Sequence, residues 1–293
     1  IGYNDLKAVN ERLVYLAITG FGPTGPYANR PAYDPIAQGL VGGCFIQGKA
    51  FGGRPQLIQS AIVDKTTAHI AAGIAVSALY ARDCNGGTGK GQRVDVPMID
   101  AWAACSLSDI MPVDAFVPNE MADPEPLAVL RTFATKDGYV VGMALQDNHF
   151  HGLCKALECE ELLEREGMRN VGERIADFGP WLDAIGKEMQ KFTSEDLLAR
   201  LDAHGVPFGP VKTMREFAED PQAQNNRTLF DAEHPDAGTM RYIRHPGHLS
   251  ETPACLHRHA PRLGEHSEEV LAELGFSEED IARLIGAGIV GKM

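Results

Sequence analysis

A carboxylate beside the start of an Ala-rich segment is the first residue of this chain that could carry chemistry. Asp64 follows the short apolar run 60–63 and precedes a stretch with helical spacing that extends to Arg82. This pattern predicts a strand, then Asp64 at the junction, then a helix whose positive end keeps the carboxylate ionised. An ionised carboxylate can attack a thioester carbonyl without a helper base and form a mixed anhydride. The simpler alternative is that Asp64 is only the N-cap of the helix.

Three further motifs contain residues that could carry chemistry, and the sequence predicts a structural role for each. His69 lies on a different side of the helix from its first residues, which is typical of a partly buried helix residue. The glycine-rich loop 86–91 lacks the Ser or Thr of a phosphate-binding loop and precedes a strand, so it predicts a turn with backbone contacts. Cys255, His257 and His259 alternate as zinc ligands would on a strand, but nearby prolines break the segment, and we predict no metal.

The elements around Asp64 follow from apolar runs and chain breakers. The first half of the chain predicts a strand at 13–18, a glycine turn at 19–22, a loop over 23–37 with a helix entered from Pro35 to Val41, a strand at 93–97 and a helix at 99–111. The second half predicts a hairpin at 133–145 with Asp137-Gly138 as its turn, and helices at 147–158, 178–191, 194–204, 267–274 and 277–287. Proline and acidic residues between 111 and 126 indicate a linker.

Composition excludes several classes of protein. The chain has 293 residues, of which 44% are hydrophobic and 23% charged, as in an ordinary globular protein. Its net charge of −13 argues against a nucleic-acid or anionic membrane surface. Residues 1–112 hold 9 basic and 8 acidic side chains, so an anionic ligand is repelled less there than by residues 113–293, with 18 and 32. Six cysteines without a paired spacing, no membrane-spanning run and no signal segment predict a cytoplasmic protein.

Five segments together resemble the class III CoA-transferase (CaiB/BaiF) family, in the order that family has them. They are 18–43 (ITGFGPTGPYANRPAYDPIAQGLVGG), 60–82 (SAIVDKTTAHIAAGIAVSALYAR), 87–101 (GTGKGQRVDVPMIDA), 204–222 (HGVPFGPVKTMREFAEDPQ) and 260–284 (APRLGEHSEEVLAELGFSEEDIARL). The family usually begins about one hundred residues earlier than Ile1, with a segment that provides much of its CoA-nucleotide site. We therefore expect that an N-terminal part of this α/β domain is missing, cleaved or supplied elsewhere.

The resemblance implies an α/β fold with two domains and two interlocked subunits. A Rossmann-like large domain is expected from both chain ends, residues 1–112 and 213–293, with a linker at 113–127 and a smaller α+β domain at 128–212. The implied partners are an acyl-CoA, a carboxylic acid and a second copy of the chain in a homodimer, without nucleic acid or membrane. Coenzyme A enters as a substrate, and no resident cofactor is expected.

The resemblance also implies roles for individual residues. Asp64 stands at the position of the family's nucleophile, which accepts the acyl group as an anhydride, exchanges it for CoA as an aspartyl-CoA thioester and passes CoA to a second acid. The residues that match the family's loop at the CoA and acyl-binding site are Arg30, Ala32, Tyr33 and Asp34, with Gln38 close by. The implied activity is therefore transfer of CoA between carboxylic acids.

Two alternatives stay open at this point. An acyl-CoA racemase of the same family would use Asp64 as a base, although Tyr33 stands where that branch has a histidine. A non-catalytic subunit would need a partner for the expected missing part. Residues 118–127 lack the glycine-rich loop of the oxalate-handling branch, which disfavours formyl-CoA and oxalate as substrates.

Overall fold

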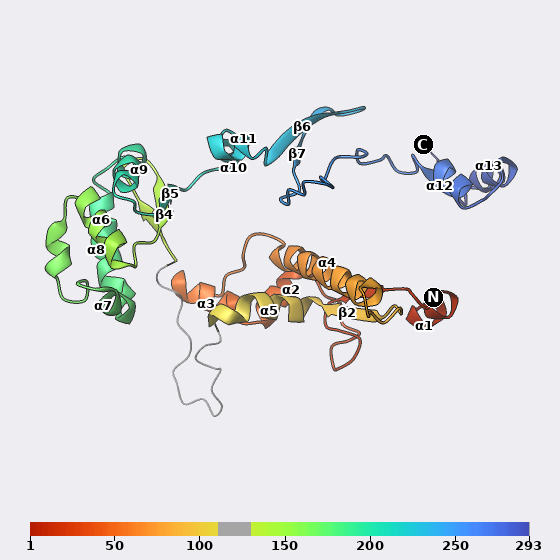
Figure 1. The fold of residues 1–293 in the computed structure, drawn as a ribbon, viewed down its shortest axis with the longest axis horizontal. Coiled ribbons are helices and arrows are strands. Elements are labelled where there is room, and N and C mark those ends of the chain that lie inside the picture. Colours follow the sequence, from red (N-terminus) through yellow and green to blue (C-terminus); the bar gives the residue numbers. More distant parts are fainter. Residues whose placement is uncertain (111–129, 293) are drawn as a thin grey trace. The chain divides into compact units, whose positions relative to one another are not determined.

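The computed structural model describes residues 1–110 and 130–292 (Figure 1). Contacts within the chain separate two compact units, Ile1–Gly209 and Pro210–Met293. The linker expected at 113–127 lies outside the described residues, and so does the segment 118–127. The division into a large and a small domain therefore stays a prediction.

Residues 1–110 form a short parallel β-α-β arrangement with added helices. The elements are α1 (Tyr3–Val9), β1 (Tyr15–Thr19), α2 (Asp34–Leu40), α3 (Gly43–Ala50), α4 (Ile62–Asp83), β2 (Arg93–Pro97) and α5 (Met98–Ile110). Strands β1 and β2 pair in parallel, from Tyr15 opposite Arg93 to Thr19 opposite Pro97. A parallel pair requires a crossover connection, which here includes the long helix α4. The mixed α/β class expected from the sequence is confirmed.

Two small apolar clusters hold these helices against the strands. Helix α4 contacts α2, α5 and both strands. Val63 packs with Ala37 and Trp102 at the start of α4, whereas Ala71 packs with Val96 farther along the helix, together with Ala101. The alanines of α4 allow this close approach because they add little volume between helix and sheet. The core beneath Asp64 is thus made by α2, α4 and α5.

The expected strand at 60–63 is wrong. Helix α4 already begins at Ile62, so Asp64 is the third residue of the helix and does not lie at a strand-to-helix junction. The hydroxyl of Thr66 donates to the carbonyl of Ile62 at 2.7 Å, and the carboxylate of Asp34 accepts the N–H groups of Val63 and Asp64. These contacts provide hydrogen-bond partners for the first turn of the helix. The four-residue apolar run did not indicate them.

Residues 130–209 contain a three-stranded sheet and a set of helices. The elements are β3 (Thr132–Ala134), β4 (Tyr139–Gly142), α6 (Asp147–Ala156), the 3₁₀ helix η1 (Glu160–Glu164), α7 (Val171–Ala176), α8 (Phe178–Met189), α9 (Ser194–Ala203) and β5 (Phe208–Pro210). The strand order is β3-β4-β5. The hairpin expected at 133–145 is confirmed, with Phe133 opposite Val140. The sequence analysis missed η1, α7 and β5.

A continuous apolar core lies inside this second region. Its large, fully buried members include Val140, Phe150, Leu153, Leu157, Met168, Trp181, Ile185, Met189, Leu197 and Leu201. They come from β4 and from α6, α8 and α9, with Met168 from the loop before α7. The apolar faces of these helices therefore meet in one core.

One arginine is fully buried at the edge of this core. The guanidinium of Arg174 donates to the carbonyl oxygens of Leu145, at 2.7 and 3.1 Å, and of Met168, at 2.7 Å. It also pairs with Asp147 and lies 4.5 Å from the ring centroid of Phe150. A buried guanidinium is tolerated because these groups satisfy its donors.

Residues 210–292 consist of short helices, a hairpin and a terminal helix pair. The elements are α10 (Met214–Ala218), α11 (Pro221–Asn225), β6 (Leu229–His234), β7 (Gly238–Ile243), α12 (Ser267–Glu273) and α13 (Glu278–Gly286). The terminal helices are confirmed, whereas the antiparallel pair β6 and β7 was missed. Its turn signal is the segment 235–238, Pro-Asp-Ala-Gly. No helix among the described residues is long and apolar enough to cross a membrane.

Replacing Arg174 tests the buried arginine. We expect Arg174→Ala to lower the free energy of unfolding of this region by about 3 kcal/mol, because the carbonyls of Leu145 and Met168 lose their donors. The measurement is urea unfolding followed by Trp181 fluorescence in a Trp102→Phe background, where Trp181 is the remaining tryptophan. The matched variant Arg169→Ala removes an exposed arginine of the same region that pairs with Glu173, and it should cost less than about 1 kcal/mol. Equal losses in both variants would contradict the assignment.

Candidate active site

Asp64 occupies the first turn of a 22-residue helix. It is solvent-exposed, while the preceding Val63 is fully buried. The N-cap of the helix is Ala61, which has no polar side chain, so Asp64 is not the N-cap. Within residues 1–110 and 130–292, the Asp64 carboxylate makes no hydrogen bond or ion pair. It is therefore an exposed, unpaired carboxylate in the first turn of the helix.

Asp34 and Gln38 lie directly behind this helix start. Only 6% of Asp34 and 2% of Gln38 is exposed. Both residues belong to α2. Asp34 accepts the N–H groups at the start of α4, and Nε2 of Gln38 donates to the carbonyl of Ser60 at 3.1 Å. Their polar atoms are engaged by the chain itself. The predicted contact of these two side chains with CoA or an acyl group stays a prediction.

The other candidate residues lie on the loop that leads into α2. Tyr33 is the N-cap residue of α2 and is 75% exposed. The guanidinium of Arg30 lies 4.1 Å from the ring centroid of Tyr27. Ala32 is half-buried beside Gly20. Tyr33 is therefore joined directly to Asp34, which binds the Asp64 region. Arg30 instead contacts Tyr27 within the loop, and Ala32 contacts Gly20 just after β1.

Gly20 supports the loop that carries Tyr33, a role that the sequence did not predict. It follows β1, and its backbone carbonyl accepts the N–H of Ile99 at the start of α5. A Cβ atom at this position would lie 2.2 Å from the Cβ of Ala32. The absence of a side chain therefore lets the end of β1 meet the loop that carries Tyr33. The glycine turn itself was the available signal.

Two neighbours of Asp64 were also missed or misjudged. Lys65 donates from Nζ to the Ser60 hydroxyl at 2.7 Å, which spans the helix start. His69 is exposed, so the expected partial burial is wrong, and its Nδ1 lies 2.7 Å from the carbonyl of Lys65. The face of α4 that carries His69 is exposed, so the imidazole lies in solvent.

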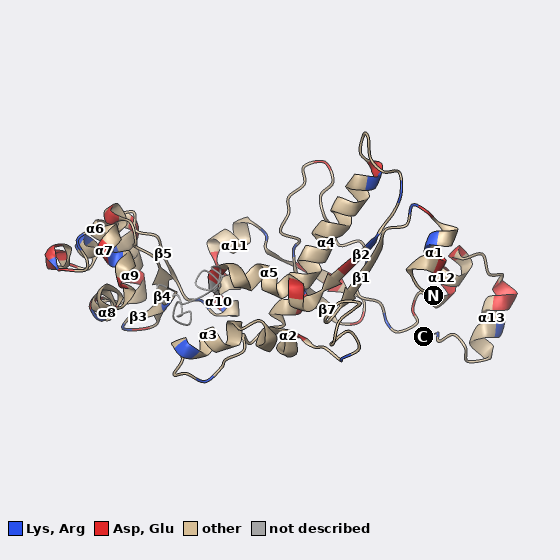
Figure 2. Cartoon of the chain, turned by 90° about the horizontal axis from the view of Figure 1, so that it is seen from below, with Lys and Arg blue, Asp and Glu red and all other residues tan. Residues whose placement is uncertain are grey.

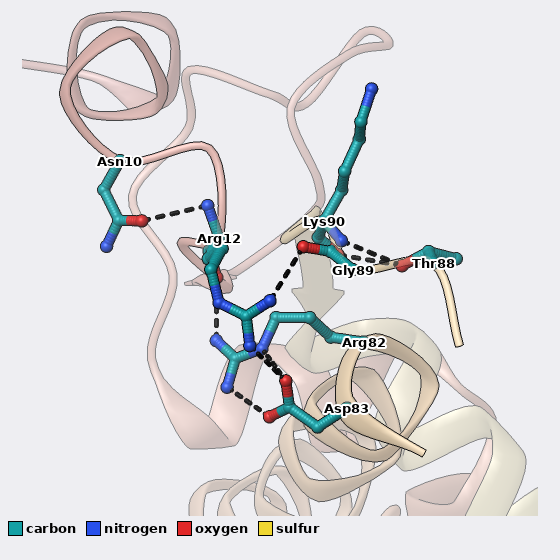
Figure 3. Close-up of polar contacts among 7 residues, drawn as sticks. All are labelled: Asn10, Arg12, Arg82, Asp83, Thr88, Gly89 and Lys90. Carbon is teal, nitrogen blue, oxygen red and sulfur yellow. Dashed lines mark hydrogen bonds and ion pairs between the residues drawn. The ribbon is translucent and has the colours of Figure 1, made fainter. Parts of the chain in front are cut away.

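The far end of α4 is attached to the start of β1 by an arginine network (Figure 3). Arg12 pairs with Asp83 and donates to the carbonyl of Gly89 at 3.0 Å. Arg82 also binds Asp83 and donates to the Arg12 carbonyl at 2.7 Å. In the loop 86–91, the N–H of Gly89 donates to the carbonyl of Arg82. The expected turn with backbone contacts is confirmed.

Charge along α4 is confined to its two ends (Figure 2). Asp64 and Lys65 lie in the first turn, and Arg82 and Asp83 close the helix. Between them, exposed apolar side chains include Ile74, Val76, Leu79 and Tyr80. An anionic substrate that approaches Asp64 thus meets only one other carboxylate on this helix, at its opposite end.

The cysteine and histidine segment forms pairwise contacts. The Sγ of Cys255 lies 3.3 Å from Nε2 of His257. His259 instead contacts the Tyr242 hydroxyl at 3.2 Å. Across residues 1–110 and 130–292, no three His, Cys, Asp or Glu side chains are grouped so that they could hold a metal ion.

Comparison with known proteins decides the family. Residues 1–267 match CoA-transferase family III. The chain belongs to this family. Succinate–glutarate CoA-transferase of Agrobacterium fabrum is 32% identical over 278 residues, covering 94% of this chain and 68% of that protein. Succinyl-CoA:glutarate CoA-transferase of Homo sapiens is 27% identical over 296 residues, covering 99% and 66%.

The fold agrees with a solved member of family III. A crystal structure of a CaiB/BaiF family protein from Brucella suis matches with a TM-score of 0.76 and 30% identity, over 94% of this chain and 71% of that one. The expected class III (CaiB/BaiF) resemblance is therefore confirmed. The chain spans about two thirds of the length of the curated relatives described above.

Two glycine substitutions test the packing behind the candidate active site. We expect Gly20→Ala to lower the free energy of unfolding by about 1–3 kcal/mol, because the new methyl collides with Ala32. Gly39→Ala is the control, since nothing lies within 4 Å of a Cβ there, and an alanine in α2 should stabilise the helix by up to about 1 kcal/mol. Thermal unfolding measures both. A neutral Gly20→Ala would contradict the close approach.

The arginine network predicts a pH dependence. Hydrogen bonding from Arg82, more than any other cause, holds the pKa of Asp83 below its usual range. Its stabilisation is therefore present above the unfolded pKa of about 3.9 and is lost as pH falls through the lower folded value. We expect Asp83→Asn to be less stable than wild type at pH 7, with the difference decreasing as pH falls below about 3.9. Trp102 fluorescence during heating measures it in a Trp181→Phe background, where Trp102 is the remaining tryptophan.

The control for this experiment is Asp109→Asn, which removes an exposed carboxylate of α5. The stability of this variant should stay close to that of wild type at every pH. A deficit of Asp83→Asn that stays constant from pH 7 to pH 3 would contradict the role of the ionised carboxylate.

Proposed function

We propose that the protein containing this chain transfers CoA from an acyl-CoA to a carboxylic acid, with Asp64 as the covalent nucleophile. The observation that carries the proposal is the exposed, unpaired carboxylate of Asp64 in the first turn of α4. Membership of CoA-transferase family III supports the reaction class. A carboxylate free of cations keeps its electron pair available for attack.

The proposed reaction proceeds through two kinds of Asp64 adduct. The carboxylate attacks the thioester carbonyl, the C–S bond breaks, and CoA leaves as a thiolate while the acyl group stays on Asp64 as a mixed anhydride. The thiolate then attacks the Asp64 carbonyl, which forms an aspartyl-CoA thioester and releases the donor acid. The acceptor carboxylate attacks this thioester and expels the thiolate again. Attack of the thiolate on the acceptor acyl carbon yields the new acyl-CoA and frees Asp64.

Each step needs a neighbouring structure to exclude water and align the acyl group. The buried Val63 lies beside Asp64, and the exposed Tyr33 lies on the adjoining loop. We assign Tyr33, with Arg30 and Ala32, to the wall of the CoA and acyl site. No group beyond the two substrates is required to balance the reaction, and CoA itself is a substrate.

We propose short dicarboxylic acids, such as succinate and glutarate, as the substrate class. Two relatives named for succinate and glutarate support this choice. The near-neutral charge of residues 1–112 is compatible with a dianionic acid and with CoA. The homodimer and the cytoplasmic location belong to the same proposal, and the six free cysteines are compatible with a reducing compartment.

Substitution of the nucleophile tests the proposal. We expect Asp64→Asn to reduce succinyl-CoA:glutarate transfer by at least about 10⁴-fold, because an amide cannot form the anhydride. Wild-type protein incubated with succinyl-CoA and then hydroxylamine should carry a hydroxamate at Asp64, mapped by mass spectrometry. The full-length protein is used for both measurements.

The matched control is Asp196→Asn, because Asp196 is also an exposed third residue of a helix, in α9. Its transfer rate should stay within about twofold of wild type. Transfer that survives Asp64→Asn, or a hydroxamate mapped elsewhere, would refute the proposal.

A further inference from the structure

Helix α4 begins without a cap of its own. Ala61 is the N-cap residue and offers no side-chain acceptor. The hydroxyl of Ser60, the next candidate, accepts from Nζ of Lys65. The first N–H groups of a helix have no partner within the helix, so they need an acceptor from elsewhere.

Asp34 provides that acceptor from another helix, 29 and 30 positions away in the sequence. Its Oδ2 accepts the N–H of Val63 at 2.7 Å and the N–H of Asp64 at 3.1 Å. Because the carboxylate is buried, both bonds are shielded from competing water and are strong, charge-assisted ones. The backbone of Asp64 is therefore bonded directly to α2.

Gln38 orients this carboxylate and binds the segment before α4. Its Nε2 donates to Oδ1 of Asp34 at 2.6 Å and to the carbonyl of Ser60 at 3.1 Å. Its Oε1 accepts the N–H of Ile58 at 3.0 Å. This last bond decides the orientation of the amide, so that its NH₂ group faces the carboxylate.

We propose that Asp34 and Gln38 are positioning residues that hold Asp64 in its attacking position. The proposal rests on the proposed function, in which Asp64 is the nucleophile. Tyr33 directly precedes Asp34, so the same contacts determine the distance between the substrate loop and Asp64. Reacting atoms must approach to about 3–3.5 Å, and a misplacement of about 1 Å can cost about 100-fold in rate.

Asp34→Asn is the primary variant. It keeps the size of the side chain, but it turns one oxygen into an NH₂ group that faces the NH₂ of Gln38. We expect kcat for CoA transfer to fall by about 10- to 100-fold, while KM for the acyl-CoA changes by less than about threefold. Asp34→Asn combined with Gln38→Glu gives the new amide an acceptor and should recover part of the lost kcat.

Asp220→Asn is the matched control. Asp220 likewise accepts two successive N–H groups at a helix start, those of Gln222 and Ala223, at 2.8 and 3.1 Å. It also pairs with Lys212, so the variant loses at least as many polar contacts. Its kcat should stay close to wild type. A similar loss of kcat in Asp34→Asn and Asp220→Asn would overturn the positioning role.

Hydrogen exchange provides a readout that does not depend on catalysis. In Asp34→Asn, the amides of Val63 and Asp64 should exchange at least about 10-fold faster, while the middle of α4 is unchanged. The isosteric variant Gln38→Met is the milder second test, and it should accelerate exchange at Ile58. Unchanged exchange at Val63 and Asp64 in Asp34→Asn refutes the proposal, as does unchanged kcat.

The two proposals fail in distinguishable ways. A wild-type protein without an adduct at Asp64 refutes the transferase mechanism, whatever the exchange rates show. A wild-type adduct at Asp64 together with an Asp34→Asn variant of normal kcat refutes the positioning role alone.

Discussion

The buried carboxylate of Asp34 at the start of α4 is the interaction on which the candidate active site depends. A helix start with alanine as its N-cap leaves N–H groups that require an acceptor. Asp34 meets that need from α2, and in doing so it joins the loop ending at Tyr33 to the turn that presents Asp64. One carboxylate is hidden and bonded, and its neighbour is exposed and unpaired. Two chemically identical side chains thus have different roles because their surroundings differ.

The remaining contacts of residues 1–110 keep that arrangement in place. Val63, Ala37 and Trp102 pack beneath the helix start, and the Arg12 network attaches the other end of α4 to the beginning of β1. Both ends of the helix are therefore held by polar contacts, while its middle packs through alanines against β2 and α5. Because the charged residues of α4 are confined to its ends, the electrostatic character near Asp64 is determined by only a few groups.

Residues 130–209 are stabilised in a different way. Their core is continuous and rich in large side chains, and it surrounds Arg174 with backbone carbonyls. A buried guanidinium is compatible with such a core only when its donors are satisfied, so this arginine orders the loops that contain Leu145 and Met168. Residues 130–209 are thus stabilised mainly by a large apolar core. Helix α4 has only small apolar clusters and is held at its ends by hydrogen bonds and ion pairs.

The sequence by itself determined the elements with strong local signals. Ala-rich spacing predicted α4, Asp137-Gly138 predicted the β3–β4 hairpin, and five segments predicted the family. Local signals were insufficient at 60–63, because the acceptor that begins α4 comes from Asp34, 29 residues earlier. The same limit applies to Gly20, whose role depends on contact with Ala32. Residue type thus identified the candidate nucleophile, whereas only tertiary structure revealed what holds it, since hydrogen bonds and close packing join residues distant in sequence.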